Sequence, residues 1–362
     1  MVLSMDNTAP KRARKQSAPA GAHARRRSIR EKKAGKAETD EVLLKTFAAE
    51  ARTGLAKAAH AAGIGKSTAF HALRGLIEAY GIRFVPEIDL KNLRAQELSH
   101  AIAGRKKKEL KALPQLADAG LMEFACFIKF IDPIPDATAL SAAFSKIDCV
   151  QYASMLLSGN YDAFAYLLCR SFSEASSLAS SLSSLLTECR LEVDITCVSG
   201  AYGYFPLTDA LLKSLRISDA YKQMLLALNS GARGRLNDMG KNKDWATYAY
   251  SSLKKSGLLK RTTLYMSSPE DKFLGIVRLH FATADDYSNG SARAVSFMRE
   301  SKGYRCVFIA ETLAPYGIMA ILNAKSSAAF ESVKKEFHSD GSAAHVETYV
   351  ITKAVFGSLG IR

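Results

Sequence analysis

The stretch from Leu55 to Ile77 constrains the chain most, because it reads as two short helices joined by a tight turn. Small apolar residues run to Ala62, Gly63 permits a sharp reversal of direction, and Ser67 can cap a second helix. This pattern predicts a helix-turn-helix unit. In such units the second helix enters the major groove of DNA, so its outward side chains contact the duplex.

One side of that second helix must pack inward, and Ala69, Leu73 and Leu76 fall on one helical stripe. Most residues on the opposite side can donate hydrogen bonds to phosphates and base edges. The outward residues, which we expect to bind DNA, are Lys66, Ser67, Thr68, Phe70, His71 and Arg74. The alternative for this surface is a solvated helix of an interaction module that does not touch DNA.

The run from Gly65 to Thr68 also resembles the end of a phosphate-binding loop. That motif needs a glycine five residues before Gly65, where His60 stands, and it needs a preceding β-strand. The segment before it is rich in alanine and helical by propensity. We therefore exclude nucleotide binding at this position.

The 362 residues, of which 48% are hydrophobic, are enough for several domains with their own cores. No apolar run approaches the roughly 18 residues of a transmembrane helix, and the N-terminus lacks the apolar core of a signal peptide. We expect a cytoplasmic, nucleoid-associated protein that does not bind membranes. The six cysteines form no C-x-x-C pair, so we expect buried reduced thiols, no metal site and no cofactor.

The net charge of +15 is unevenly distributed along the chain. Residues 1–36 carry eleven Lys and Arg against two acids, and residues 213–262 carry eleven against three. Residues 121–212 carry four against ten. This segregation predicts nucleic-acid contact through the basic parts and protein or small-molecule contact through the acidic part.

The order of elements predicts six segments. Residues 1–39 contain few large apolar side chains and are expected to form a disordered basic arm that adds salt-sensitive DNA affinity; a nuclear-localisation signal or a solubilising tail are the alternatives. Residues 40–90 form the helix-turn-helix domain with a short strand at 82–88, and residues 91–120 form a polar, partly helical linker. Residues 121–212 read as strand, helix, strand, strand, helix, strand, which predicts an α+β fold with a ferredoxin-like antiparallel sheet.

This arrangement resembles the leucine-responsive regulator/AsnC (Lrp/AsnC) family of transcription regulators, in the divergent form found in archaea. The resemblance rests on the element order, on the tight turn Gly159-Asn160-Tyr161-Asp162 and on the run from Tyr202 to Leu207. Family members carry Gly-Asp-Tyr-Asp at the turn, and Asn160 replaces the first aspartate here. The resemblance covers about residues 40–212.

The rest of the chain reads as a second copy of the same pair. A shift of 177 residues places Ala69 on Ala246 and Leu76 on Leu253, which predicts a second, degenerate helix-turn-helix at 213–262. Its expected DNA-facing residues include Lys243, Trp245, Thr247 and Tyr248. Residues 263–362 repeat the strand and helix order, with the first of their helices expected at 291–301, so the chain is expected to carry two DNA-binding units and two ferredoxin-like domains. A purely structural second unit is the alternative.

The resemblance implies a mechanism. In the family, ferredoxin-like domains pair, and effectors that are often amino acids bind at their interfaces, which implies a homo-oligomeric regulator of double-stranded DNA. The residues expected to contact an effector are Gly159, Asn160, Tyr161, Asp162, Tyr316 and Gly317. Simple hairpin chemistry is the alternative explanation for these residues.

We expect the chain not to be an enzyme, because its seven histidines are scattered, no nucleophile motif occurs, and no segment is left over for a catalytic domain. The alternative function is a sequence-tolerant chromatin or RNA-binding protein. Strands 122–130 and 161–169 are apolar on both faces, which argues against an open RNA-binding sheet and leaves the chromatin role as the stronger competitor.

Overall fold

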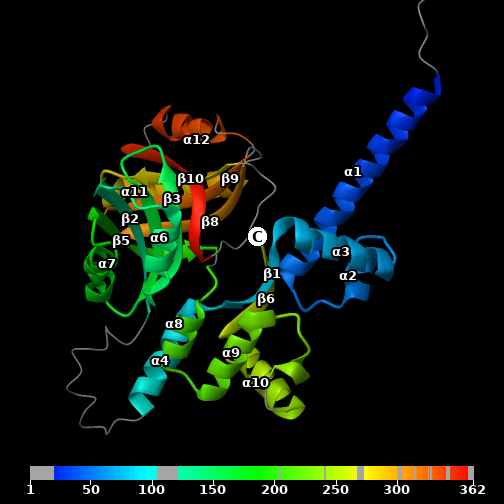
Figure 1. Cartoon of the computed structure of the whole chain (residues 1–362), viewed down its shortest axis with the longest axis horizontal. Helices are drawn as coiled ribbons and strands as arrows, with labels where there is room; N and C mark the ends of the chain where they lie inside the picture. The colour runs from blue at the N-terminus through cyan, green and yellow to red at the C-terminus, as the bar shows by residue number, and fades with distance from the viewer. Residues whose placement is uncertain are drawn as a thin grey trace, which may run out of the picture.

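The computed structural model describes residues 20–103, 121–203, 205–239, 242–266, 273–300, 304–313, 315–324, 326, 328–339 and 343–357. The fold is mixed α and β with antiparallel sheets, consistent with the predicted class. A barrel of eight strands forms one part, and two groups of helices joined by a two-stranded ribbon form the other (Figure 1). Among the described residues, no helix combines the length and apolar character needed to span a bilayer.

The barrel is built from two four-stranded halves that have the same topology. The first half contains β2 (Met122–Asp132), β3 (Val150–Leu157), β4 (Ala163–Cys169) and β5 (Arg190–Tyr202). The second contains β7 (Phe273–His280), β8 (Tyr304–Leu313), β9 (Gly317–Ala324) and β10 (His345–Gly357). The closed order is β10-β3-β4-β2-β5-β8-β9-β7, so β5 pairs with β8 and β10 pairs with β3 across the two halves. Closure removes every free sheet edge.

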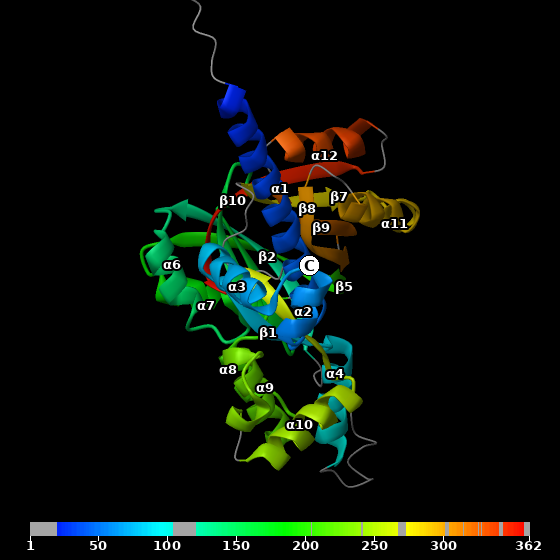
Figure 2. The same cartoon turned by 90° about the vertical axis from the view of Figure 1, so that its right-hand side faces the viewer.

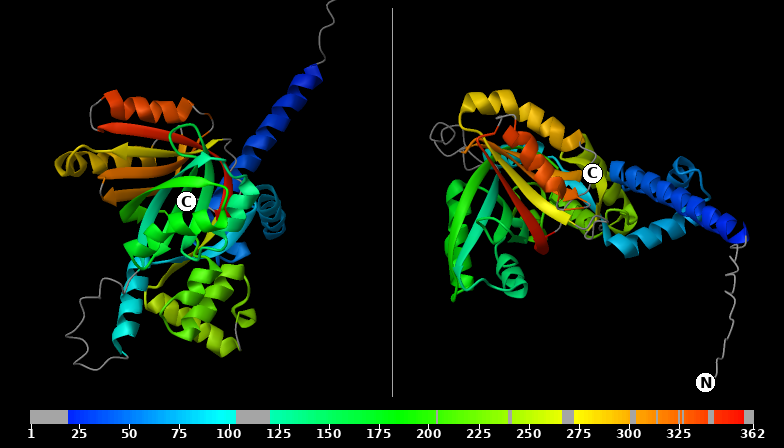
Figure 3. Two further views of the ribbon diagram at one scale, coloured as in Figure 1. Left: turned by 60° about the vertical axis from the view of Figure 1, so that its left-hand side comes forward. Right: turned by 90° about the horizontal axis from the view of Figure 1, so that it is seen from above.

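Helices cover the outside of the barrel, as two views show (Figure 3). The first half carries α6 (Ala137–Phe144) and α7 (Phe172–Leu185), and the second carries α11 (Ala284–Glu300) and α12 (Ala328–Ser339). Each pair buries an apolar stripe on its own sheet. In α7 the buried residues Ala175, Leu178 and Leu182 follow the helical repeat.

Aromatic side chains fill part of the barrel interior. Phe205, which follows β5, stacks on Tyr166 with ring centroids 4.3 Å apart and lies 4.6 Å from Phe308 and 5.3 Å from Tyr152. The same apolar cluster continues into α8 (Asp209–Ser214) and the helices beyond it. The barrel and the second helical group therefore share one core, which limits their independent movement.

The first helical group consists of α1 (Ala20–Ala49), α2 (Leu55–Ala61) and α3 (Lys66–Tyr80), followed by strand β1 (Ile82–Ile88). The second consists of α9 (Asp219–Gly231), the short 3-10 turn η2 (Leu236–Asp238) and α10 (Lys243–Lys255), followed by strand β6 (Leu259–Met266). β1 and β6 pair antiparallel and lie between the two groups (Figure 2). Each strand also packs on the first helix of the opposite group, since α1 contacts β6 and α9 contacts β1.

Four details differ from the sequence-based expectation. Helix α1 begins at Ala20 rather than near Asp40, because its Ala, Arg, Lys and Glu residues favour helix. Leu43 and Phe47 anchor the C-terminal end of this helix in a core. Residues 1–19 of the predicted arm lie outside the described residues. The predicted linker is partly helical, as expected, with helix α4 (Leu90–Ala103), but it is not polar throughout, because Leu93 of that helix is buried in the core. The middle helix of the second group shrinks to η2, and α11 begins seven residues before the predicted start at position 291.

Candidate functional site

Helix α3 presents the residues that the sequence assigns to DNA on its solvent side. Its inward stripe of Ala69, Leu73 and Leu76 is buried in the core formed with α1 and α2. All six outward residues are exposed: Lys66, Ser67, Thr68, Phe70, His71 and Arg74. Phe70 leaves 52% of its surface exposed and contacts the His71 ring edge-on. An exposed apolar side chain beside donors suits contact with base edges and thymine methyl groups.

Arg74 is held in place by a neighbour on its own helix. Its Nε donates to Glu78 Oε1 at 2.9 Å, and both side chains are about two-thirds exposed. Exposed ion pairs contribute little to stability, so a phosphate or a guanine can replace Glu78 at small cost. The first turn of α3 follows Gly65 and has no side-chain cap, which leaves its N–H groups facing solvent.

Helix α10 occupies the corresponding place in the second group. It buries Ala246, Ala249 and Leu253. Of the residues assigned to DNA, Lys243, Thr247 and Tyr248 are exposed, Tyr248 by 71%, whereas Trp245 is half-buried against the core. Trp245 therefore serves packing more than contact.

Charged residues clamp the two helical groups together. Arg52 after α1 donates to the carbonyl oxygen of Ala232 at 2.7 Å, and Arg233 lies over the Phe47 ring at 4.3 Å. Burial, together with the charge of Arg52, lowers the pKa of Arg233. Glu50 pairs with Lys254 at 3.2 Å. These cross-contacts join the two helical groups to each other.

Glu50 shows how closely the groups are joined. Burial alone would raise the pKa of Glu50, but hydrogen bonds from Thr262 and the Arg52 backbone, with the charge of Lys254, lower it. Thr262 belongs to β6 of the second group, and Glu50 directly follows helix α1 of the first group. The carboxylate is thus stabilised by donors from both groups.

The turn at 159–162 lies beside the barrel interior. Gly159 has φ of +92°, and a Cβ there would lie 2.4 Å from the Tyr349 ring, so glycine is required by both backbone and space. The Tyr161 hydroxyl donates to Asp194 Oδ2 at 3.3 Å. Asp162 accepts from the Phe130 N–H at 2.8 Å, which makes it a structural residue of the hairpin, and Asn160 is exposed.

Tyr316 lies in the turn before β9, and Gly317 is the first residue of that strand. Tyr316 packs on Tyr287 with ring centroids 5.8 Å apart. Gly317 is buried opposite His280, and a Cβ would lie 2.5 Å from the Leu279 carbonyl oxygen. Tyr161 packs on Phe127, and Gly317 lies beside Leu279, so both border residues that line one cavity.

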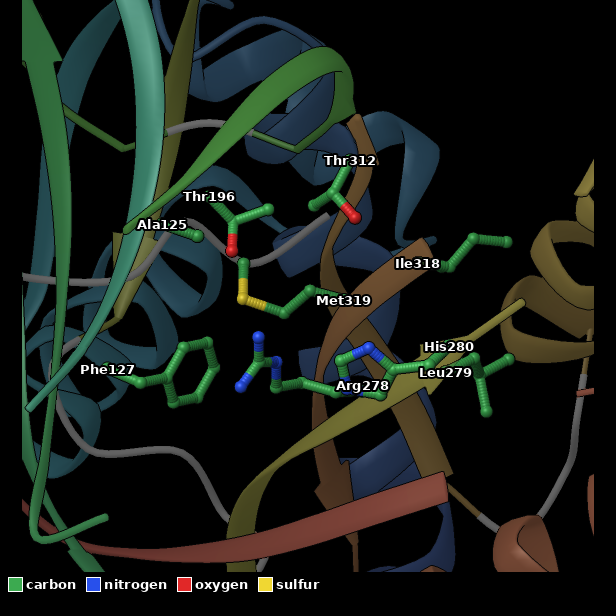
Figure 4. Close-up of a pocket in the computed structure, with 9 residues that line it drawn as sticks. All are labelled: Ala125, Phe127, Thr196, Arg278, Leu279, His280, Thr312, Ile318 and Met319. Carbon is green, nitrogen blue, oxygen red and sulfur yellow. The ribbon is translucent and has the colours of Figure 1, made fainter. Parts of the chain in front are cut away.

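That cavity lies between the two halves of the barrel and has room for about one water molecule, since only about 10 Å³ is open to the centre of a water-sized sphere and the surrounding empty space of about 240 Å³ includes open solvent. Figure 4 shows its lining, which comes from β2, β5 and the strands of the second half: Ala125, Phe127, Thr196, Arg278, Leu279, His280, Thr312, Ile318 and Met319. Thr196 is buried and its hydroxyl has no hydrogen-bond partner in the described structure. A buried unpaired hydroxyl is costly unless a water or ligand satisfies it.

Arg278 dominates the electrostatics of the cavity. Only 6% of its surface is exposed, and its guanidinium lies 4.0 Å from the centre of the Phe127 ring. Its Nη2 donates to Asp194 Oδ2 at 2.9 Å, and its Nη1 lies 3.2 Å from Glu347 Oε2 in an ion pair. Burial lowers the pKa of the guanidinium, but the two carboxylates more than offset this and raise it.

Two histidines converge on one of these carboxylates. His280 Nε2 lies 3.3 Å and His345 Nε2 lies 3.5 Å from oxygens of Glu347. Burial would raise the pKa of Glu347, but the His280 hydrogen bond and the Arg278 charge lower it to about 2. The sequence reading missed this cluster. The sequence signal for it is the alternation of side chains along a strand. Arg278 and His280 lie on one face of β7, and His345 and Glu347 lie on one face of β10.

A possible metal-binding group lies elsewhere in the first half. The sulfur atoms of Cys149 and Cys169 and a carboxylate oxygen of Glu174 lie within 4.8 Å of one another. Burial and the neighbouring Cys149 raise the pKa of Cys169. That shift favours a protonated thiol, whereas a metal needs the thiolate.

No family model matches the chain, and no curated protein matches it. Among solved structures, siroheme decarboxylase NirDL covers 88% of this chain and 93% of its own at 10% identity, with a TM-score of 0.53. The complex of NirDL with an iron-uroporphyrin III analogue gives a TM-score of 0.51 at 11% identity. Escherichia coli AsnC, at 19% identity, covers 45% of this chain and 91% of its own, with a TM-score of 0.30.

These similarities establish a shared fold with NirDL across most of the chain. Regulators of the Lrp/AsnC family appear among the structural neighbours over about two-fifths of the chain. The expectation that the chain is not an enzyme is contradicted by the NirDL match. Because the match covers 93% of a decarboxylase, the absence of a leftover catalytic domain is no argument against catalysis.

Proposed function

We propose that this chain is a DNA-binding transcription regulator in which α3 and α10 enter the major groove and the paired sheets hold a small-molecule effector site. One observation carries the proposal. α3 buries one apolar stripe and exposes all six residues that could contact a duplex. A helix of this kind, preceded by a short helix and followed by a strand, is the arrangement in which proteins read base edges.

The placement of the two helices supports the same function. α3 and α10 each lead into one strand of the β1–β6 ribbon, and ion pairs across the groups hold them at a fixed spacing. A fixed spacing matches the regular repeat of major grooves along one face of DNA. The excess of eleven basic residues over three acids in 213–262 adds affinity for phosphates.

The effector site is proposed at the Arg278 cavity. An amino acid carries a carboxylate for Arg278 and an ammonium group for Asp194 or Glu347, and the unpaired Thr196 hydroxyl can complete the contacts. The cavity lies between the two halves of the barrel and has room for about one water molecule, so an amino acid would have to move the halves apart to enter and would then touch both. A ligand that favours one arrangement of the halves shifts the helical groups by linkage.

A second candidate is decarboxylation, favoured by the convergence of Arg278, His280 and Glu347 beside this cavity in a fold that NirDL shares. Arg278 would hold the leaving carboxylate, and His280 would protonate the carbon as carbon dioxide departs. The cavity has room for about one water molecule, so a tetrapyrrole would require the two halves of the barrel to separate. Release of carbon dioxide from siroheme that a His280→Ala variant loses would support this candidate; no release above the protein-free control would remove it.

DNA binding is tested by a salt titration with a labelled duplex that contains the promoter of this chain, against a scrambled duplex. The reading-helix variant carries Lys66→Ala and Arg74→Ala. The matched control carries Lys129→Ala and Lys146→Ala, which removes two exposed lysines from the barrel. Both variants lose the same charge from exposed positions, so they differ in location alone.

The proposal predicts that the reading-helix variant loses at least tenfold in affinity and most of its preference for the promoter, whereas the control keeps both. Deleting residues 1–36 removes eleven basic residues and is expected to flatten the salt slope while leaving the preference intact. Equal binding of both duplexes by all proteins would refute sequence-specific reading and favour a chromatin role. No binding at low salt would refute DNA binding altogether.

A further inference from the structure

The ribbon between the helical groups has a register that maps onto itself. Val85 of β1 pairs with Thr263 of β6, and Pro86 pairs with Thr262. Adding 177, the shift that aligns the helices, takes position 85 to 262, and subtracting 177 takes position 263 to 86. The pair Val85–Thr263 therefore maps onto the pair Pro86–Thr262. The ribbon therefore has an approximate two-fold axis.

This axis also relates the two reading helices. α3 ends two residues before β1, and α10 ends four residues before β6. The same axis exchanges α1 with α9, since each packs on the strand of the opposite group. Duplex DNA has local two-fold axes along its length, and symmetric dimers place two helices about such an axis, so we expect the two helices of this chain to face two half-sites in the same way.

The inward residues of the two helices agree, and the outward residues do not. Ala69 corresponds to Ala246 and Leu76 to Leu253, and all four are buried. On the outward side only the first exposed pair, Lys66 of α3 and Lys243 of α10, is identical. The other exposed pairs, each with the α3 residue first, are Ser67 and Asp244, Phe70 and Thr247, His71 and Tyr248, and Arg74 and Ser251. The scaffold is repeated, and the reading surface differs.

The differing residues have different base chemistry. Arg74 can form two hydrogen bonds with guanine O6 and N7, whereas Ser251 cannot. Asp244 accepts a hydrogen bond from the cytosine amino group and repels phosphate, whereas Ser67 does neither as strongly. The Thr247 methyl suits the methyl group of thymine.

We propose that this single chain recognises a bipartite, non-palindromic duplex site, with one half read by α3 and the other by α10. The inference rests on the proposed DNA binding. The two halves lie about 10 base pairs apart, or a multiple of that, because the helices must face the same side of the duplex. Since both helices belong to one chain, the chain binds its site in a single orientation.

Selection of binding duplexes from a random library by the full-length chain, followed by sequencing, tests the inference. The expected motif has two unlike halves at a helical-turn spacing. Arg74→Ala is expected to relax base preference in one half, by about 5- to 150-fold at its guanine, and to leave the other half unchanged. Tyr248→Ala is expected to affect the other half alone.

A designed variant makes the test stricter. The changes Asp244→Ser, Thr247→Phe, Tyr248→His and Ser251→Arg give α10 the outward residues of α3 at four exposed positions. This variant is expected to select a palindrome made of two copies of the α3 half, with circular dichroism checking that it folds. The single substitutions test the same point without altering four positions at once.

The outcomes separate the inference from the function on which it rests. A palindromic or single half-site motif for the natural chain would overturn the bipartite site while leaving DNA binding in place. An effect of Arg74→Ala and Tyr248→Ala on the same half would likewise overturn the bipartite site and leave DNA binding in place. Failure to enrich any sequence, with binding that is equal on all duplexes, would instead overturn the proposed sequence-specific function.

Discussion

The Arg278 cluster gives the sharpest prediction about stability. The change is Arg278→Met, which keeps most of the side-chain volume and removes the charge. Asp194 and Glu347 then lose a partner at 2.9 and 3.2 Å, and the side chain of Glu347 is only 16% exposed. Breaking a buried ion pair from one side costs about 3–5 kcal/mol, so the barrel should lose that much at pH 7.

The pH dependence gives the prediction a sign. The pKa of Glu347 is lowered to about 2 from 4.5, so the natural chain keeps this stabilisation above pH 4.5 and loses it as the pH falls towards 2. In the variant the His280 hydrogen bond still lowers the pKa of Glu347, but the lowering charge of Arg278 is gone, so this pKa moves up towards its ordinary value. The variant should therefore lose less stability than the natural chain as the pH falls from 4.5 towards 2.

Amide hydrogen exchange of β7 and β10 measures the barrel directly. Trp245 is the single tryptophan and lies in α10, whose group shares a core with the barrel, so its fluorescence during urea unfolding reports whether the loss spreads to the helical groups. The Arg278→Met, Glu347→Gln double variant should recover part of the loss, because it removes one stranded charge. A loss below 1 kcal/mol, or a variant that weakens with acid as the natural chain does, would refute this account of the cluster.

Three further predictions concern the barrel. Phe205→Ala should cost about 3–5 kcal/mol, seen in urea unfolding, because it empties the space against Tyr166; a loss under 1 kcal/mol would show that Phe205 is dispensable. Gly159→Ala should lower the melting temperature, since the residue has φ of +92° and a Cβ would meet the Tyr349 ring, and an unchanged melting temperature would contradict that geometry. Glu347→Gln should remove part of the acid sensitivity between pH 5 and 3, which unfolding curves at both values would detect.

Most strands and helices could be predicted from local sequence. Alternation and apolar runs locate β2, β3 and β4 within about two residues, because each strand is short and bounded by Gly, Pro or Asn. The outward and inward sides of α3 also follow from the helical repeat alone. These features depend on neighbours along the chain, which the sequence shows directly.

The closure of the barrel and the Arg278 cluster depend on distant residues. β10 pairs with β3 across nearly 200 positions, and nothing in either strand marks its partner. Arg278 and Asp194 meet only because the two halves face each other. His280 and His345 looked scattered in the sequence, but their strands pair in register. Helix α1 was missed before position 40 because its basic residues suggested disorder, although they also favour helix.

The central claim is that one chain reads duplex DNA with two helices, and hydroxyl-radical footprinting of the selected duplex tests it most directly. At a stoichiometry of one chain per duplex, the account predicts two protected segments on the same face of the DNA, about one helical turn or a multiple of it apart. The Lys66→Ala, Arg74→Ala variant should lose protection of one segment first. One protected segment would contradict reading by α10, and uniform protection or none would contradict sequence-specific reading by this chain.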